Sequence, residues 1–324
     1  MIVIGREEVR RRLTYEVCIP LVREAMIALS RGVTRQIPRA IIDLDKGHMF
    51  GVMPGALGPG DAFGAKLISV FPENFEKGRQ SHQGLVAIFD PEDGALAAIV
   101  HAGEVTAIRT AAASAVATDV LARAEAGTLA ILGYGEQAHT HLAAMSRVRP
   151  LTDVRVWGRS PERAAAFAAK ASGDTGLPVR AAATVEAAVE AADIICAVSA
   201  AAEPILLGRQ VAEGCHVNLV GSSRAGPAEA DDDLVARARF FADHRQGVLL
   251  QGAEFLNARA SGRIEESHLL GEIGQVLDGT LPGRLTAADV TVYKSLGSIV
   301  QDLASAWTLY ENARAEGFGV AVEF

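Results

Sequence analysis

Three isolated basic side chains in the first third of the chain are the first candidates for chemistry. Arg39, Lys66 and Arg109 each stand in a segment of apolar or small residues. A cation in such a segment is costly unless it meets an anion. The three residues therefore suit the binding of a small carboxylate. A second interpretation stays open, in which they form ordinary ion pairs with Asp43, Asp61 or Glu104.

A glycine-rich turn near the middle of the chain predicts a dinucleotide site. Residues 128–132 have the composition of a buried strand, residues 133–138 read Gly-Tyr-Gly-Glu-Gln-Ala, and a helical pattern follows. Gly133 permits the tight turn, and Gly135 lets backbone N–H groups approach a pyrophosphate at the positive end of the helix. The motif alone arises by chance in chains rich in Ala and Gly, but the flanking strand and helix favour a dinucleotide-binding turn.

The residues after the second strand of this region bear on the choice of cofactor. That strand is predicted to end at Trp157, and Gly158-Arg159-Ser160 follows. NAD sites usually carry Asp or Glu here for the ribose 2′-hydroxyl, and that acid is missing. Arg159, Ser160 and Arg163 suit a 2′-phosphate, so NADPH is favoured over NADH. A compatible interpretation is that Ser160 only caps a helix while the arginines are solvated.

The remaining histidines, serines and cysteines give weaker signals. His82, in Ser81-His82-Gln83, is of a kind that is more often structural than catalytic. No serine stands in a Gly-x-Ser-x-Gly motif, and no metal site is predicted because the spacing of the histidines does not suit zinc. Cys18, Cys196 and Cys215 lie far apart and are predicted to be reduced core thiols.

Composition narrows the class of protein. The 324 residues are 49% hydrophobic and 22% charged, which is typical of a soluble globular protein with room for two domains. A formal net charge of −8 argues against a nucleic-acid partner. The N-terminus lacks the pattern of a signal peptide, and the apolar runs are too short to span a bilayer, so we expect a cytoplasmic protein without a membrane partner.

Periodicity predicts an α/β fold in two domains, 1–124 with 300–324 and 125–299. The first domain begins with one or two amphipathic helices in 6–31 and continues as an antiparallel sheet that leads into a long helix. The second alternates strands and helices, as a doubly wound Rossmann sheet does. The predicted strands are 40–44, 49–53, 62–71, 84–89, 95–100, 128–132, 153–157, 178–180, 193–198, 216–220 and 290–293. The predicted helices are 106–124, 136–148, 161–172, 185–191 and 298–315, with a helix and a strand in 231–243 and a polar helical stretch reaching about residue 277.

Taken together, these segments resemble the ornithine cyclodeaminase/mu-crystallin family over nearly the whole chain. Each match is modest alone, but their order along the chain is highly specific. The matching segments are residues 37–39, 51–54, 66–72, 81–83, 106–114, 133–138, 203–206 and 294–297.

The resemblance implies a homodimer whose first domain provides the dimer interface and the substrate site. It implies that Arg39, Lys66 and Arg109 bind the substrate carboxylate, and that Lys66, Arg109 and Ser223 are the catalytic positions. The cofactor positions that it implies are His82, Gln83, Arg109, Thr110, Gly133, Tyr134, Gly135, Glu136, Gln137, Gly158, Arg159, Ser160, Arg163, Val198, Ser199, Ser223 and Ser295.

One departure from the family pattern bears on the reaction. The cyclodeaminases carry an aspartate in the glycine-rich loop where this chain has Ser223, followed by Arg224. The ketimine reductases of the family likewise have serine and arginine at these positions. Because a hydroxyl is not an anionic base at neutral pH, the loop favours imine reduction over cyclodeamination and places the chain closest to the ketimine reductase branch.

The predicted function is therefore NAD(P)H-dependent reduction of a small cyclic imino acid that carries a carboxylate. The expected substrates are Δ1-pyrroline-2-carboxylate and Δ1-piperideine-2-carboxylate, which would give L-proline and L-pipecolate, with NADPH preferred and NADH as the second choice. The alternatives are an alanine-dehydrogenase-like or acyclic imine reductase, an ornithine cyclodeaminase, and a non-catalytic protein that binds NADPH and a ligand.

Overall fold

The computed structural model describes residues 1–323 and, except for Phe75 and Glu76, their side chains. The chain separates into two compact units. Unit 1 consists of Met1–Ala112 and the C-terminal segment from Ser298, and unit 2 of Ala113–Gly297. The first boundary lies inside one continuous helix, α3, and not at the end of that helix, where the sequence pattern placed it.

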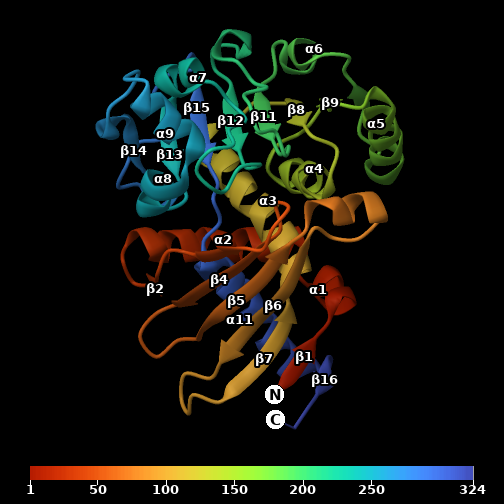
Figure 1. The fold of residues 1–324 in the computed structure, drawn as a ribbon, viewed down its shortest axis with the longest axis vertical. Coiled ribbons are helices and arrows are strands. Elements are labelled where there is room, and N and C mark those ends of the chain that lie inside the picture. Colours follow the sequence, from red (N-terminus) through yellow and green to blue (C-terminus); the bar gives the residue numbers. More distant parts are fainter. Residues whose placement is uncertain (324) are drawn as a thin grey trace. The chain divides into compact units, whose positions relative to one another are not determined.

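Unit 1 is built on a sheet in the strand order β16-β1-β7-β6-β5-β4-β2, with β3 paired to β4 (Figure 1). The pairs from β2 to β7 are antiparallel, as predicted, whereas β1 and β7 are parallel. The elements are β1 (Ile2–Ile4), α1 (Arg6–Arg12), α2 (Tyr15–Ser30), β2 (Arg35–Gln36), β3 (Ala40–Asp43), β4 (Met49–Ala56), β5 (Phe63–Val70), the 3-10 helix η1 (Pro72–Lys77), β6 (His82–Phe89), β7 (Leu96–His101), α3 (Ala102–Leu121), α11 (Ile299–Glu316) and β16 (Val320–Ala321).

The helix α11 packs on one face of this sheet, and α2 packs on α11. α11 packs against α2 and against β4, β5 and β6, and it runs behind these strands in Figure 1. Most of α11 is buried, including the polar residues Gln301 and Asp302. The core of unit 1 therefore contains charged and amide groups that need partners inside it.

The sequence pattern missed the first strand and the start of α3. β1 pairs with both β7 and β16, but it is only three residues long and carries no turn signal or alternation of its own. α3 begins at Ala102, four residues before the predicted start at 106. Pairing with distant strands decides β1, so local patterns do not reveal that strand.

Unit 2 is an eight-stranded sheet in the order β10-β9-β8-β11-β12-β15-β13-β14, and all its pairs are parallel. The chain runs outward from β8 on one side and from β11 on the other, which puts a topological switch point between these two strands. The elements are β8 (Thr128–Leu132), α4 (Glu136–Val148), β9 (Asp153–Trp157), α5 (Pro161–Thr175), β10 (Val179–Ala181), α6 (Val185–Val189), β11 (Ile194–Ala197), η2 (Gly208–Gln210), β12 (His216–Leu219), α7 (Asp232–Arg237), β13 (Arg239–Ala242), α8 (Arg245–Gln251), α9 (Ala253–Ala260), η3 (Glu266–His268), β14 (Leu269–Glu272), α10 (Ile273–Leu277) and β15 (Thr291–Lys294).

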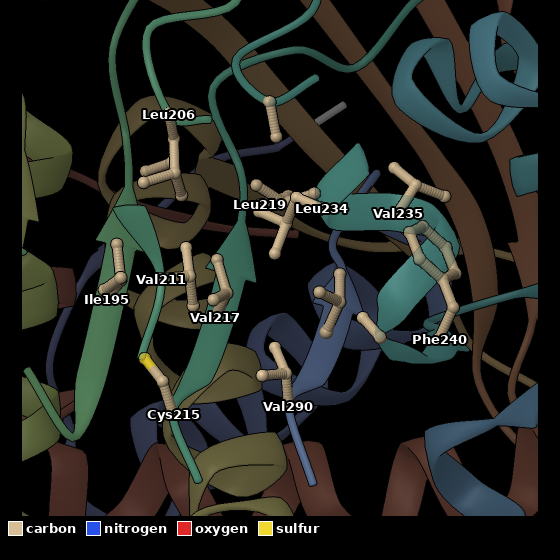
Figure 2. Close-up of a cluster of buried hydrophobic side chains, with 14 of the residues drawn as sticks. Ile195, Leu206, Val211, Cys215, Val217, Leu219, Leu234, Val235, Phe240 and Val290 are labelled. Atoms are coloured by element: carbon tan, nitrogen blue, oxygen red, sulfur yellow. The ribbon is translucent and has the colours of Figure 1, made fainter. Parts of the chain in front are cut away.

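The central strands of unit 2 are buried on both faces, as parallel strands covered by helices are. Figure 2 shows part of this core, with Ile195 and Val217 on neighbouring strands and Leu234 and Val235 on α7. The doubly wound sheet predicted from the sequence is confirmed. The helical stretch predicted to reach residue 277 is interrupted by β14, a four-residue edge strand paired with β13.

Candidate active site

Unit 1 brings Lys66 and Arg109 to one buried carboxylate. Lys66 Nζ lies 2.9 Å from Asp302 Oδ2, and Arg109 Nε lies 3.1 Å from Asp302 Oδ1. Arg109 Nη1 also donates to Gln301 Oε1 at 3.0 Å, and Lys66 Nζ donates to Thr106 Oγ1 at 3.4 Å. The three side chains, 0–5% exposed, come from β5, α3 and α11 and form a single buried cluster.

This carboxylate is not one of the partners considered from the sequence. Glu104 instead pairs with Arg6 and Arg10, at 3.2 and 2.9 Å. Sequence reasoning missed Asp302 because its neighbours in α11 are apolar or small and its partners lie about 200 residues earlier in the chain. The only local signal is a Gln-Asp pair in the first half of the helix, where the other residues are apolar or small.

Strand register explains which predicted residues share a face of the sheet. Lys66 pairs with Val86 and His82 with Val70, so Lys66 and His82 lie on the same face. Gln83 pairs with Ser69 and lies on the opposite face, where its amide donates to the Gln80 carbonyl at 3.4 Å. The structure therefore does not bring Gln83 to the cluster.

The cluster carries more positive than negative charge. Two cations share the single carboxylate of Asp302, and the half-buried Arg39 lies near enough for its charge to lower the pKa of both Lys66 and His82. Burial would raise the pKa of Asp302, but Arg109 and Lys66 together lower it. Burial lowers the pKa of Lys66 to about 7, with the Asp302 charge opposing and the Arg109 charge adding to the effect. An anion would balance the surplus.

His82 is neutral at physiological pH. Burial lowers its pKa to about 4, and the charges of Lys66, Arg109 and Arg39 act in the same direction. Its Nδ1 lies 2.9 Å from Ser81 Oγ. A neutral ring can donate or accept a hydrogen bond but does not add to the positive charge. Thr110, next to Arg109 on α3, is also buried.

In unit 2 the glycine turn has the geometry that its sequence predicts. Gly133 has φ +133°, and a Cβ there would lie 2.9 Å from the Val198 carbonyl oxygen, so the turn requires glycine. Gly135 is the N-cap of α4 and offers no side chain, which leaves the first N–H groups of the helix open to an anion. Glu136 and Gln137 form its first turn.

The ring of Tyr134 lies directly against Gly158. A Cβ at position 158 would come within 2.2 Å of Tyr134 Cδ1 and Cε1. Ser160 then caps α5: its Oγ accepts from Arg163 N at 3.2 Å and donates to Glu162 Oε2 at 2.8 Å. The guanidinium groups of Arg159 and Arg163 are exposed and have no partner among the described residues. Ser160 therefore caps the helix and the two arginines are exposed to solvent, as the second interpretation of this segment expected.

Among the buried polar atoms that lack a hydrogen-bond partner in the described part of the chain, two belong to predicted cofactor positions. These are Gln137 Oε1, in the first turn of α4, and Ser295 Oγ, directly after β15. Buried polar atoms are usually hydrogen-bonded, so an unpaired oxygen in the helix after the glycine turn and another at the carboxyl end of β15 fit a site that a ligand completes. The Gly133 turn, the open helix end and these atoms suit a dinucleotide.

The segments after β11 and β12 hold Val198, Ser199 and Ser223. Val198 N donates to the Leu132 carbonyl, which ties this segment to the glycine turn. Ser199 N and Oγ both lie 2.7 Å from Glu229 Oε1. Ser223 is half-buried, and its hydroxyl has no hydrogen bond to another described residue.

Within residues 1–323 no group of three or more His, Cys, Asp or Glu side chains is arranged to hold a metal ion. Cys18, Cys196 and Cys215 are free and buried, as predicted. No described helix combines the length and the apolar character needed to cross a bilayer.

Comparisons with known proteins agree over the whole chain. The model of the ornithine cyclodeaminase/mu-crystallin family matches residues 1–317. The ketimine reductase mu-crystallin of Mus musculus is 35% identical over 314 residues, which are 95% of this chain and 96% of that protein. Solved structures are also similar to the whole chain. The Δ1-pyrroline-2-carboxylate reductase of Thermococcus litoralis, in complex with NADH and L-proline, has a TM-score of 0.96 and 31% identity, covering 99% and 100% of the two chains. An archaeal alanine dehydrogenase dimer with bound NAD has a TM-score of 0.93 and 26% identity, covering 100% and 99%.

Proposed function

Since the chain belongs to the ornithine cyclodeaminase/mu-crystallin family, we propose that it is an NAD(P)H-dependent reductase of small cyclic imino acids. It would convert Δ1-pyrroline-2-carboxylate or Δ1-piperideine-2-carboxylate to L-proline or L-pipecolate. The observation that carries the proposal is the buried cluster in unit 1, where Lys66 and Arg109 share one carboxylate. The complex of the Thermococcus enzyme with NADH and L-proline supports the substrate class.

The surplus positive charge would hold the substrate carboxylate. Asp302 fixes Lys66 and Arg109 inside the core, and the guanidinium of Arg39 adds a third positive charge. A guanidinium binds a carboxylate through two parallel hydrogen bonds, which also fixes the orientation of the substrate. A held carboxylate fixes the neighbouring C=N carbon for reaction.

Unit 2 would hold the dinucleotide. When bound, NAD(P)H supplies the hydride that reduces the C=N bond. The N–H groups at Gly135 and in the first turn of α4 would bind the pyrophosphate, and Gln137 Oε1 and Ser295 Oγ would gain partners. The exposed Arg159 and Arg163 support a preference for NADPH. The nicotinamide contacts of His82, Gln83 and Thr110 remain predictions from the family resemblance.

Lys66 is suited to move the proton that imine reduction requires. A protonated imine nitrogen makes the adjacent carbon a better hydride acceptor. Because burial lowers the pKa of Lys66 to about 7, its Nζ can both carry and release a proton near neutral pH. Ser223 has no carboxylate to activate an amine, which disfavours cyclodeamination.

An acyclic imino acid is the second candidate substrate. The likeness to the archaeal alanine dehydrogenase, at 26% identity and a TM-score of 0.93, favours it. The cluster recognises the carboxylate, which cyclic and acyclic substrates share. What distinguishes the two is therefore ring closure and not charge.

A substrate panel tests the proposal. Enzyme is mixed with NADPH or NADH and with one substrate at a time. The substrates are each cyclic imine, pyruvate plus ammonia, and pyruvate plus methylamine. The absorbance of the reduced cofactor is followed. A separate reaction with ornithine is assayed for released ammonia. We expect the highest kcat/KM with a cyclic imine and NADPH. Oxidation with neither cyclic imine would rule out the proposed reaction, and faster turnover of pyruvate with an amine would select the acyclic alternative.

We also propose that the protein is a homodimer that works in the cytoplasm. Apolar side chains in and beside β3 are exposed, among them Ile37, Ile41, Ile42 and Leu44, and the archaeal relative is described as a dimer. Three free buried cysteines suit a reducing compartment. Light scattering of the wild type should give the dimer mass, and Ile42→Lys should shift it towards the monomer. A monomeric wild type would contradict the dimer.

A further inference from the structure

One carboxylate in unit 2 joins the segments that follow two neighbouring strands. Glu229 is completely buried. Its Oε1 accepts from Ser199 N and from Ser199 Oγ, both at 2.7 Å, and its Oε2 accepts from Gly221 N at 2.6 Å. Ser199 follows β11 and Gly221 follows β12. The side chain of Glu229 therefore holds the segments that follow both strands.

A second carboxylate and a lysine extend this connection to a third strand. Glu229 N donates to Glu254 Oε1 at 3.1 Å, and Glu254 Oε2 lies 2.7 Å from Lys294 Nζ. Lys294, the last residue of β15, also donates to the Ser222 carbonyl at 2.7 Å. Glu254 and Lys294 are completely buried. The carboxyl ends of β11, β12 and β15 are therefore linked by one buried network.

The place of the network in the sheet connects it with the dinucleotide. In open parallel sheets, ligands bind beyond the carboxyl ends of the strands at the switch point, which here lies between β8 and β11. Val198, Ser199, Ser223 and Ser295 are predicted cofactor positions, and all lie on the linked segments. Neither the glycine turn nor the cation cluster uses Glu229.

We propose that Glu229 is a positioning residue for the dinucleotide, holding the segments after β11 and β12 in the arrangement that binds it. The inference rests on the proposed function, because it assumes a dinucleotide at this edge of the sheet. Preorganised segments raise affinity because they need no ordering when the ligand binds.

The network also makes this positioning dependent on pH. Burial raises the pKa of Glu229 to about 7, opposed by the hydrogen bonds from Ser199 and the charge of Lys294 and assisted by the charge of Glu254. Burial raises the pKa of the nearby Cys196 thiol to about 12, so that group stays neutral. Ionised Glu229 accepts all three hydrogen bonds, whereas its protonated form gives up acceptor capacity. The segments are therefore held best above pH 7.

Glu229→Gln tests the inference, with Asp193→Asn as the matched control. Asp193 also joins two strands, since its Oδ2 accepts from Gly127 N at 2.9 Å and Thr128 N at 3.0 Å, but at the amino ends of β8 and β11. The dissociation constant of NADH is measured by its fluorescence between pH 6 and 8, together with Tm. NADH is used because it lacks the titrating 2′-phosphate.

We expect Glu229→Gln to raise the dissociation constant about tenfold at pH 8, because an amide nitrogen would face a backbone donor. Wild type and Glu229→Gln should converge at pH 6, where wild-type Glu229 is protonated. Asp193→Asn should lower Tm and leave the wild-type affinity and pH dependence in place.

Equal affinity of Glu229→Gln and wild type at pH 8 would overturn the inference, as would a wild-type affinity that does not change with pH. The second measurement needs no variant and can overturn the inference even if Glu229→Gln does not fold. NADH binding without reduction of any imine would contradict the proposed reaction and leave this inference standing. A wild type that binds neither NADH nor NADPH would overturn both.

Discussion

Each unit contains a buried cluster of three charged side chains, and the two clusters have opposite charge balance. In unit 1 two cations, Lys66 and Arg109, share the carboxylate of Asp302. In unit 2 there are two carboxylates, Glu229 and Glu254, and one cation, Lys294, which forms an ion pair with Glu254. Both clusters link segments far apart in the chain, so burial and connectivity alone do not distinguish them.

The difference lies in what neutralises the surplus charge. In unit 2, backbone and hydroxyl donors at Ser199 and Gly221 meet the surplus carboxylate, so the chain itself completes the cluster. In unit 1 two cations share one carboxylate, and their other acceptors, an amide oxygen and a hydroxyl, carry no charge. A buried charge surplus thus indicates a ligand site only where the surrounding chain leaves it unbalanced.

The largest expected effect is on catalysis. Lys66→Met removes the surplus cation and leaves Arg109 and Asp302 as a balanced pair, so we expect a folded protein whose kcat/KM for the imine falls about 10³-fold. Steady-state kinetics measures this, with NADPH affinity and Tm as controls. Activity within tenfold of wild type would mean that the unit 1 surplus does not mark the substrate site.

The second-largest expected effect is on the free energy of unfolding, and it should differ between the two clusters. Asp302→Asn leaves the buried guanidinium of Arg109, which cannot lose its proton, without a carboxylate and should reduce the free energy of unfolding by about 3 kcal/mol. Lys294→Met should cost less, because Glu229, with its pKa already raised to about 7, can take up a proton. Urea unfolding at pH 7 compares the two variants. Equal losses would remove the distinction between the clusters.

The smallest effect is on the pH dependence of stability. The pKa of Lys66 is lowered on folding, so the unfolded chain binds more protons above pH 7 and Lys66 makes stability rise with pH there. The pKa of Glu229 is raised, so the folded state binds more protons below pH 7, and Glu229 makes stability fall as pH rises through that range. Each slope is at most about 1.4 kcal/mol per pH unit.

Urea unfolding between pH 5 and 9 checks these slopes. Lys66→Met should remove the rise above pH 7, and Glu229→Gln should remove the fall below it. A variant that keeps the wild-type slope in its own range would show that its residue does not titrate as described.

Much of the fold and of the candidate site could be predicted because the signals lie in short, contiguous stretches of the sequence. The Gly133 turn, its strand and its helix are contiguous, and a cation among apolar residues is visible at Lys66 and Arg109 without knowledge of the fold. The family resemblance then supplied roles for both regions. The strands and helices between residues 128 and 220 were predicted to within three residues of their ends.

What escaped prediction depends on contacts between distant segments. Asp302 becomes the partner of Lys66 only because α11 packs on β5, and Glu229 lies in a loop whose sequence gives no sign that its carboxylate is buried. The face of Gln83 follows from the register of β6 against β5, which a one-residue shift would reverse. Each of these is a tertiary property.

The contact between Tyr134 and Gly158 makes the residues at these two positions depend on each other in evolution. Because a single methyl group at 158 would overlap the tyrosine ring, each position sets what the other tolerates. Gly158→Ala should harm the wild type and be tolerated beside Tyr134→Ala, which is epistasis between two residues 24 positions apart. Among homologous sequences the two columns should therefore covary, with a larger side chain at 158 found only where the residue at 134 is small.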